Sequence, residues 1–553
     1  LIFRFRSGAS TSAERLRIKS DGNLKVPDDG KLELGTYSNG EFRIWHDSSN
    51  VNFIDSPTNR QLQLKGDGGF LIRGAGNQNI AQFTQADGCD LYHNQSLKLE
   101  TSSTGISVTG EVAASQDYPN IRPRLDLNFV AVKKLDSRIT YTREGPASYV
   151  DKNGLIKTVG YNTPRFDHDP ITGESKGLLI EQSRYNMFAG TANMGSEHGV
   201  WIIGGPRGKR GPNVKGPDGK LTALNNIYNG TNGDLNIYYS PRNGANEMTT
   251  SNDTIYTCSI FIKGKPGNSY LTGVRIRTYG QNISVNYNVV TGTVVGTQEN
   301  AGSDLISSSI VEYPDGWYRC IMTFRSGTDG AQGFQFYVLS GGNNGTLNSS
   351  GANGEEMYYW GAQLEAGSNA TSFIPTDDTN DSNNGSKTTR GTETVTIEGE
   401  EFTDFYNQEE GTLVLAASYI EDIRTSAAVT IDDTSNESEY TEVGYRAGGG
   451  GSGAVASYTR TDAGNDQYFK QFASSATQGN EFKVAFAYKD NDYASSVNGQ
   501  TVDTDTSGTT SKVFDRLRFS DVDTVGVVGS GHYRRFMYYP KRLPNNQVVT
   551  LTS

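Results

Sequence analysis

A short basic segment is the first feature of this sequence that could do chemistry. Residues 204–220 hold one aspartate, Asp218, and several cations, which are Arg207, Lys209, Arg210, Lys215 and Lys220. Guanidinium and ammonium groups bind carboxylate and phosphate oxygens. Charge runs of this kind also form plain solvated loops, and Gly recurs every third residue too briefly for a collagen helix. The functional hypothesis is a contact with an acidic glycan or a neighbouring subunit, made by Arg207, Lys209 and Arg210.

A second candidate site lies in the segment DNDYASSVNG, residues 490–499. The ring of Tyr493 could stack on a sugar face, and the Asn498 amide could bind its hydroxyl groups. The same residues are typical of a hairpin tip, with Asn498 and Gly499 in a primed turn. Other large rings occur within alternating segments, so we expect core packing for them; these are Trp317, Tyr359 and Trp360.

Oxygen-rich turns could hold a calcium ion. Asp151 and Asn153 alternate before a glycine in DKNG, and DHD at 167–169 adds two carboxylates. Calcium prefers such oxygen ligands, but the full binding loop with its late bidentate Glu is missing. Asx residues also favour turns for backbone reasons alone. Ca²⁺ bound by Asp151 and Asn153 is the single cofactor hypothesis, beside the alternative of no cofactor.

Catalytic motifs are missing from the sequence. It has no GxSxG, no HExxH and no phosphate-binding glycine loop before a helix. The ExDxE pattern of jelly-roll glucanases is also missing, and ESEYTE (437–442) breaks the alternation that would place three acids on one strand face. We therefore expect no catalytic residues and a protein that is not an enzyme. A depolymerase site formed between chains is the least favoured alternative.

Composition narrows the class of partner. The 553 residues carry a net charge of −12, with no basic excess that would indicate a nucleic-acid binder. The sequence contains no run of about 18 apolar residues, so we expect no membrane insertion. Hydrophobic residues make up 34%, yet 30 Tyr and 23 Phe can fill cores. Cys258 and Cys320 lie in alternating segments and are expected as buried thiols rather than a disulfide framework.

Period-two alternation between Gly, Asn and Ser turns predicts an all-β protein. A thin repeat opens the chain, since LRIKSDGNLKV (16–26) returns as LQLKGDGGFLI (62–72). IWHDSSN (44–50) similarly returns as LYHNQS (91–96). A unit this thin cannot bury a face by itself and must stack on copies of itself. Residues 1–115 are therefore predicted to form an oligomerising, repetitive β stalk.

Four regions follow the stalk. Residues 116–190 carry more charge and read as a β-rich connecting region, and residues 191–376 have longer, aromatic-rich strands typical of a β-sandwich. Residues 377–394 begin with DDTNDSNNGSKTTRGTE, which has no hydrophobic residue, and are predicted to be a linker. Residues 395–553 are predicted to form a second, jelly-roll domain. Few contacts should cross the linker.

Several motifs resemble a module found in tail-fibre and other virion structural proteins of tailed bacteriophages, notably marine ones. They are RPRLDLNF, DSRITYTREGPASYVDKNGLIKT, PRFDHDPITGESKGLLIE, DGWYRC and WGAQLEAGSNATSFIPT, between residues 122 and 376. The resemblance implies a carbohydrate-binding-module-like β-sandwich on a virion appendage. LKLETSSTGISVTGEV (97–112) is similar to repeats of cyanophage structural proteins. Residues 395–553 resemble a concanavalin A/laminin-G-type jelly roll, through YKDNDYASSVNGQ and HYRRFMYYPKRLPNNQVVTL.

The resulting hypothesis is a tail-fibre protein located on the virion that attaches to host cell-surface polysaccharide. Weak contacts in several identical copies would add up through effective concentration. The resemblance to phage fibres implies a homotrimer and contacts with other virion proteins. The alternatives are a capsid or tail decoration protein without a receptor role and, less favoured, a surface-glycan depolymerase.

Overall fold

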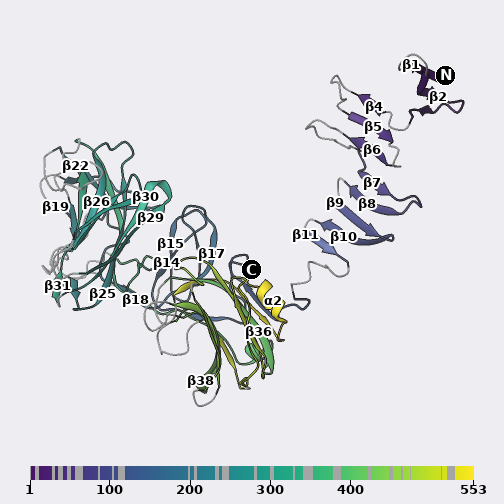
Figure 1. The fold of residues 1–553 in the computed structure, drawn as a ribbon. Coiled ribbons are helices and arrows are strands. Elements are labelled where there is room, and N and C mark those ends of the chain that lie inside the picture. The colour runs from purple at the N-terminus through teal and green to yellow at the C-terminus, as the bar shows by residue number, and fades with distance from the viewer. Residues whose placement is uncertain are drawn as a thin grey trace. The chain divides into compact units, whose positions relative to one another are not determined.

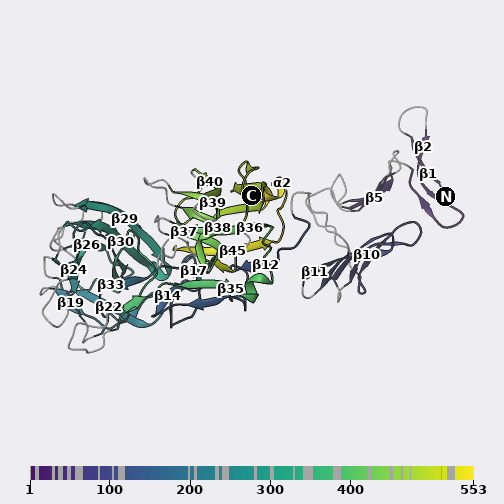
Figure 2. The ribbon, with the colours of Figure 1, turned by 90° about the horizontal axis from the view of Figure 1, so that it is seen from below.

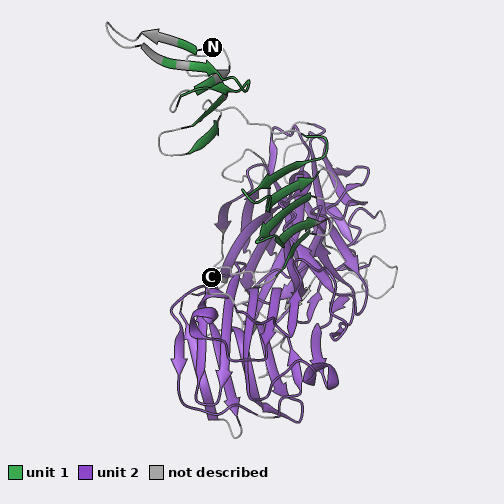
Figure 3. Ribbon diagram, turned by 90° about the vertical axis from the view of Figure 1, so that its right-hand side faces the viewer, with its two compact units in different colours: residues 1–116 green, residues 117–553 purple. Residues whose placement is uncertain are grey.

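The computed structural model consists almost entirely of antiparallel β-sheet, which confirms the predicted fold class (Figure 1). It describes residues 2–6, 12–27, 31–34, 42–46, 51–55, 66–84, 88–102, 105–109, 119–196, 200–204, 208–230, 236–239, 248–278, 283–298, 304–327, 330–340, 353–377, 388–420, 425–446, 453–461, 465–473, 475–511, 513–519 and 530–553. The chain divides into two compact units, residues 1–116 and residues 117–553 (Figure 3). They are called unit 1 and unit 2 below. The boundary lies beside the expected end of the stalk.

Unit 1 contains three small sheets. The first two are β1 (Ile2–Arg6), β2 (Ser12–Ile18) and β3 (Leu24–Lys25), then β4 (Lys31–Leu34), β5 (Phe42–His46) and β6 (Asn52–Asp55). The third has the order β11-β10-β9-β8-β7, formed by β7 (Phe70–Arg73), β8 (Asn79–Thr84), β9 (Gly88–His93), β10 (Ser96–Ser102) and β11 (Gly105–Val108). Each strand pairs with its neighbour in sequence, so the sheets are meanders built from local hairpins.

The sheets of unit 1 expose their apolar side chains. In the β7–β11 sheet the strand register places apolar residues on one face across all five strands: Phe70, Ile72, Ala81, Phe83, Cys89, Leu91, Leu99, Ile106 and Val108. Ala81 is the one buried hydrophobic residue in the described part of unit 1. Phe83 remains 42% exposed and Ile106 68% exposed. The described part of unit 1 therefore forms no hydrophobic core of its own.

The first sandwich of unit 2 packs two sheets face to face. One has the order β19-β23-β32-β26-β27-β28 and the other β20-β22-β33-β25-β30-β29, with β21 beside β22. Their strands are β19 (Trp201–Gly204), β20 (Gly208–Arg210), β21 (Val214–Lys215), β22 (Leu221–Tyr228), β23 (Asn236–Tyr239), β25 (Ile255–Gly264), β26 (Leu271–Thr278), β27 (Ser284–Asn288), β28 (Thr293–Gln298), β29 (Asp304–Tyr313), β30 (Trp317–Arg325), β32 (Phe334–Ser340) and β33 (Glu356–Ala366). Both cysteines predicted to be buried thiols, Cys258 and Cys320, lie in the core between the sheets and are free.

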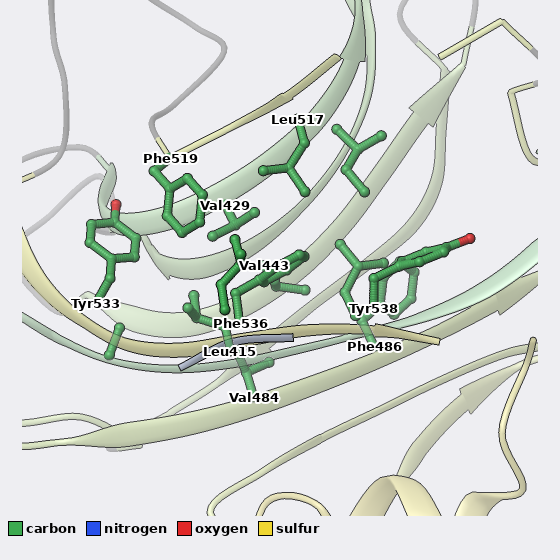
Figure 4. Close-up of a cluster of buried hydrophobic side chains, with 14 of the residues drawn as sticks. Leu415, Val429, Val443, Val484, Phe486, Leu517, Phe519, Tyr533, Phe536 and Tyr538 are labelled. Atoms are coloured by element: carbon green, nitrogen blue, oxygen red, sulfur yellow. The ribbon is translucent and has the colours of Figure 1, made fainter. Parts of the chain in front are cut away.

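The second sandwich packs an aromatic core between two larger sheets (Figures 2 and 4). One has the order β16-β17-β45-β36-β41-β42-β43, with β12 also on β45, and the other β13-β35-β44-β37-β38-β39-β40. Their strands are β12 (Leu125–Asn128), β13 (Thr140–Thr142), β16 (Arg165–His168), β17 (Ser175–Ile180), β35 (Thr394–Glu398), β36 (Glu410–Tyr419), β37 (Thr425–Asp433), β38 (Asn436–Arg446), β39 (Ala454–Thr461), β40 (Asn465–Phe472), β41 (Phe482–Lys489), β42 (Tyr493–Val497), β43 (Asp503–Asp505), β44 (Arg516–Arg518) and β45 (Gly531–Tyr539).

Short elements complete unit 2. The pairs β14 (Ala147–Val150) with β15 (Ile156–Val159), β18 (Arg184–Asn186) with β34 (Thr388–Arg390), and β24 (Met248–Thr250) with β31 (Gly330–Gln332) are two-stranded. The helical elements are η1 (Pro314–Gly316), α1 (Glu400–Thr403) and α2 (Asn545–Thr550). Among the described residues no helix is both long and apolar enough to cross a bilayer.

Two of the predicted domain boundaries need correction. Strands β12, β13, β16 and β17 belong to the second sandwich, so residues 116–190 are not a separate connecting region. The end of the predicted linker is also docked, because β34 pairs with β18 and the side chains of Arg390 and Glu393 are fully buried. Residues 378–387 lie outside the described residues. The prediction of a linker rested on the lack of hydrophobic residues in 377–393. The end of this segment is held in place by buried charged side chains rather than by apolar groups.

Candidate functional site

A cavity of about 180 Å³ lies where the β14–β15 hairpin meets both sandwiches of unit 2. The hairpin covers the outer face of the first sandwich, and its Val150 and Ile156 share a cluster with Phe261 and Trp317. Glycine is required at the tip, because Gly154 has φ +76° and a Cβ there would lie 2.4 Å from Pro314 Cγ. The cavity is lined by Ser148, Tyr149, Val150, Ile156, Asp167, Leu179, Glu181, Phe261, Tyr313, Arg319, Ala370, Thr371, Ser372, Phe373, Ile420 and His532.

Strand alternation brings Arg319 to this cavity. In β30, Cys320 and Met322 point into the core of the first sandwich, so Trp317 and Arg319 point to its outer face. The Arg319 guanidinium donates to Ser259 Oγ from Nη2 at 3.0 Å and lies 5.3 Å from the ring centre of Phe261. The residue is only 7% exposed. A buried cation therefore forms part of the cavity wall.

Asp167 and His532 form a second polar group of the wall. His532 Nε2 lies 2.8 Å from Asp167 Oδ2, and the Val150 amide donates to Asp167 Oδ1 at 2.7 Å. Asp167 comes from β16 and His532 from β45, so the second sandwich positions both groups. Both carboxylate oxygens of Asp167 are thus already hydrogen-bonded within the wall.

Glu181, the other carboxylate of the wall, belongs to a buried ionic network. Its Oε2 lies 2.7 Å from Arg165 Nη1 and 3.2 Å from Arg390 Nη1. The Ser372 amide and hydroxyl donate to Glu181 at 2.8 and 2.6 Å. Despite the desolvation that opposes ionisation, the two guanidinium groups hold the pKa of Glu181 well below its usual range.

The network continues away from the cavity to Glu393. Arg165 Nη2 lies 2.6 Å from Glu393 Oε2, and Arg143 Nη1 lies 3.0 Å from Glu393 Oε1. The side chains of these residues are fully buried. Desolvation of Glu393 is outweighed mainly by Arg165, which lowers the pKa of the carboxyl. These ion pairs join Arg165 in β16, and Arg143 directly after β13, to Glu393, which lies more than two hundred positions later in the chain.

These groups are arranged for binding rather than for acid–base chemistry. Glycoside hydrolysis needs one carboxyl that is protonated at working pH beside one that is ionised. Glu181 has a lowered pKa and is held by two arginines, so it stays ionised. Burial raises the pKa of Tyr313 to about 12, against the opposing effect of Arg319. The phenol therefore keeps its proton at neutral pH and can donate a hydrogen bond into the cavity.

Within residues 490–499, the two side chains predicted to contact a glycan make contacts within the protein instead. Tyr493 is fully buried, and its ring stacks with those of Phe486 and Tyr468. Asn498 does form the expected primed turn, with φ 49° followed by Gly499 at φ 70°. Its amide accepts from Lys483 N at 2.8 Å and donates to Ser475 O at 2.7 Å. The exposed ring expected at Tyr493 is wrong, because that residue begins a buried strand rather than a loop. Core burial of Trp317, Tyr359 and Trp360 is confirmed.

The basic segment is divided by the fold. Arg207 lies outside the described residues, and Lys209 is exposed in β20. Arg210 turns inward and donates to the backbone carbonyls of Trp201 at 2.8 Å and Met194 at 3.3 Å. The structure therefore gives Arg210 a role in holding the sandwich together, which corrects its assignment as a glycan contact.

The proposed calcium ligands form a hydrogen-bonded turn. Asp151 Oδ1 accepts from the backbone amides of Asn153 at 2.8 Å and Leu155 at 3.0 Å, and Asn153 is exposed. The two other carboxylates are separated, since Asp167 faces the cavity and Asp169 caps its own turn. Within the described ranges no three His, Cys, Asp or Glu side chains cluster as metal ligands. The Asp151 carboxylate thus stabilises the backbone of its own turn.

Sequence reasoning missed Arg319, His532 and the buried ionic network. In the motif DGWYRC, Arg319 lies on the same strand face as Trp317, and Cys320 lies on the opposite face. A charged residue on the same strand face as Trp317 was the available signal. No such signal exists for Arg165 and Glu393, because their pairing joins segments far apart in the sequence.

No protein-family model and no curated protein matches the sequence. Among solved structures, the CBM40 of Ruminococcus gnavus IT-sialidase bound to α2,3-sialyllactose aligns with 27% of this chain and 84% of its own, at 16% identity and TM-score 0.23. The NanB sialidase of Streptococcus pneumoniae aligns with 28% of this chain and 26% of its own, at 18% identity and TM-score 0.23. Mouse laminin α1 domains LG4-5 align with 57% and 88%, at 9% identity and TM-score 0.18. These scores assign neither a family nor an activity.

Proposed function

We propose that this protein is a glycan-binding appendage protein and that the junction cavity of unit 2 receives the sugar. The observation that carries the proposal is the composition of the cavity wall. Aromatic rings line it at Tyr149, Phe261 and Tyr313, and hydroxyl and charged groups line it at Ser372 and Arg319. Sugars present both an apolar ring face and a rim of hydroxyl groups, so such a mixed wall suits them.

The size of the cavity fits a small ligand. A volume of about 180 Å³ corresponds to about six water molecules. This is the scale of a single sugar ring, so one site would bind weakly. Effective attachment would then require several copies of the chain acting together.

Unit 1 supplies a physical reason for several copies. Its apolar face on β7–β11 is uncovered within the chain, and a second copy would remove that surface from water. The same pattern occurs in the β4–β6 sheet, where Leu32, Ile44 and Ile54 are paired across the strands and exposed. Self-association through unit 1 follows from this surface, and the number three rests on the resemblance to phage fibres.

The biological setting of the proposal rests on the sequence motifs. Their resemblance to virion proteins of tailed bacteriophages favours a tail fibre on the virion, with host cell-surface polysaccharide and other virion proteins as partners. A plain decoration protein would have no need of a polar cavity with a buried cation. The cavity therefore favours the receptor-binding alternative over the purely structural one.

A glycan array probed with the full-length oligomer tests the function. Ala370 lies in the cavity wall and Ala131 is exposed in a loop, so Ala370→Trp would fill the cavity and Ala131→Trp is its matched control. We expect binding to a defined set of glycans, lost in Ala370→Trp and kept in Ala131→Trp. Equal binding by both variants would place recognition elsewhere, and binding to no glycan would reject the function.

A further inference from the structure

The junction cavity contains a buried charge, that of Arg319, which no carboxylate among the described residues neutralises. Arg143, Arg165 and Arg390 are all buried, and each pairs with a buried glutamate within 3.2 Å. Arg319 is 93% buried by the same measure, yet no carboxylate in the described part of the chain forms an ion pair with it. Its hydrogen-bond partners there are neutral, namely the hydroxyl of Ser259 and the phenol of Tyr313.

The carboxyl groups of the cavity wall, those of Asp167 and Glu181, do not form an ion pair with Arg319. Asp167 is occupied by His532 and the Val150 amide, and Glu181 by Arg165, Arg390 and Ser372. Both carboxyl groups are thus already hydrogen-bonded to other protein groups. An uncompensated buried guanidinium is unfavourable unless a ligand or water supplies oxygen atoms.

We propose that the junction cavity binds an acidic sugar, with the anionic group of the sugar held by Arg319. This inference rests on the proposed glycan binding and names the class of glycan. A planar guanidinium can donate two parallel hydrogen bonds to a carboxylate or a sulfate ester. Ser259 already orients the Nε and Nη2 edge, and the phenol of Tyr313 stands beside it as a further donor.

The geometry also accounts for the rest of the ring. Tyr149 and Phe261 offer apolar surface to a sugar face, while the hydroxyl of Ser372 is within reach of the cavity. Neutral sugars could enter the same space but would leave Arg319 without an anion. Because a hydrogen bond to a charged group contributes more than a neutral one, the acidic ligand should bind more tightly.

The test measures binding of the full chain to a matched series of sugars. The probes are methyl galacturonoside, its methyl ester, methyl galactoside and galactose 6-sulfate, titrated by calorimetry. We expect galacturonoside or the sulfate to bind about 10-fold or more tighter than the uncharged probes. A preference for one of the two anions identifies the acidic group. If neither the galacturonoside nor the sulfate bound more tightly than the uncharged probes, the inference would be overturned while glycan binding stayed intact.

Variants separate the charge from the fold. Arg319→Gln should lower the affinity for the acidic probe to that for the methyl ester, so that the preference is lost, whereas Arg319→Lys should keep part of the preference. Arg325→Gln is the matched control, since Arg325 lies in the same strand and pairs with exposed Asp253. If Arg319→Gln fails to fold, the folded Arg319→Lys variant takes its place. Addition of salt should then abolish the remaining preference of Arg319→Lys for the acidic probe, which reports the ion pair. An unchanged preference in a folded Arg319→Gln would also overturn the inference, and binding of no sugar by any form would reject the proposed function itself.

Discussion

Units 1 and 2 differ in how far their β-sheets bury apolar side chains. Unit 1 keeps its sheets thin and local, and its apolar rows stay exposed. Unit 2 folds two sandwiches with full aromatic cores and even buries charged groups between them. In its described part the first unit leaves its apolar side chains exposed, which is why we propose that it is stabilised by other copies, whereas the second buries its cores within one chain.

The difference also locates function. The self-association proposed for unit 1 would cover its apolar faces and leave them unavailable for a receptor contact. Unit 2, by contrast, has no need of a partner to close its cores and can hold a polar cavity at the junction. We therefore propose assembly as the role of unit 1 and recognition as the role of unit 2, and each proposal can be tested separately.

Breaking the ionic network should have the largest effect on the comparison. Arg165→Ala leaves Glu181 and Glu393 buried with less compensation, so we expect unit 2 to lose about 3–5 kcal/mol of its free energy of unfolding. Urea unfolding followed by tryptophan fluorescence measures it. Arg138→Ala is the control, because its half-exposed pair with Asp136 should contribute at most about 1 kcal/mol. A loss below about 1 kcal/mol for Arg165→Ala would show that the network does not hold unit 2 together.

The second prediction places a charge on the apolar face of unit 1. Phe83→Lys should weaken self-association by about 1.5–3 kcal/mol per chain, the value of burying one large apolar side chain. Sedimentation velocity should then show smaller species at the same protein concentration. Gln82→Lys changes the opposite face of the same strand and should leave the assembly intact. If both variants sediment like the wild type, the β7–β11 face is not the interface.

Acid should affect unit 2 through the network. The folded-state pKa values of Glu181 and Glu393 are lowered, so their stabilisation is complete above the usual glutamate pKa of about 4.3 and is lost as pH falls below it. The free energy of unfolding should be flat from pH 7 to about 5. Below that it should fall by up to about 1.4 kcal/mol per pH unit for each glutamate. A Glu393→Gln variant should show a shallower decline, and an equal slope would assign acid sensitivity to other carboxylates.

The smallest expected effect concerns the basic segment. Lys209 is exposed, so its attraction for an acidic glycan is screened within about 8 Å at physiological salt. Lys209→Ser should change the adsorption rate to host cells by less than about twofold. That change should vanish when the salt concentration is raised. A large or salt-independent loss of adsorption rate would contradict this prediction and would indicate that the segment 204–220 makes the main receptor contact.

Much of the fold was predictable from local pattern. Alternating segments such as 256–264 and 315–324 became the buried strands β25 and β30, because period-two patterning directly reports one covered face. The Asn498–Gly499 turn was also predictable, since the two residues tolerate positive φ. The exposed ring at Tyr493 was not, because a tyrosine after a polar turn can begin either a loop or a buried strand.

The sequence by itself determined the strands, their turns and the exposed apolar rows in the described part of unit 1, since these depend on neighbouring residues. Only the tertiary structure decided where the charged residues go. Glu393 stands in a segment without apolar residues, yet Arg143 and Arg165 reach it across the fold. Arg319 and His532 meet at one cavity although they come from different sandwiches. Pairing of this kind depends on which distant strands become neighbours, and no local periodicity carries that information.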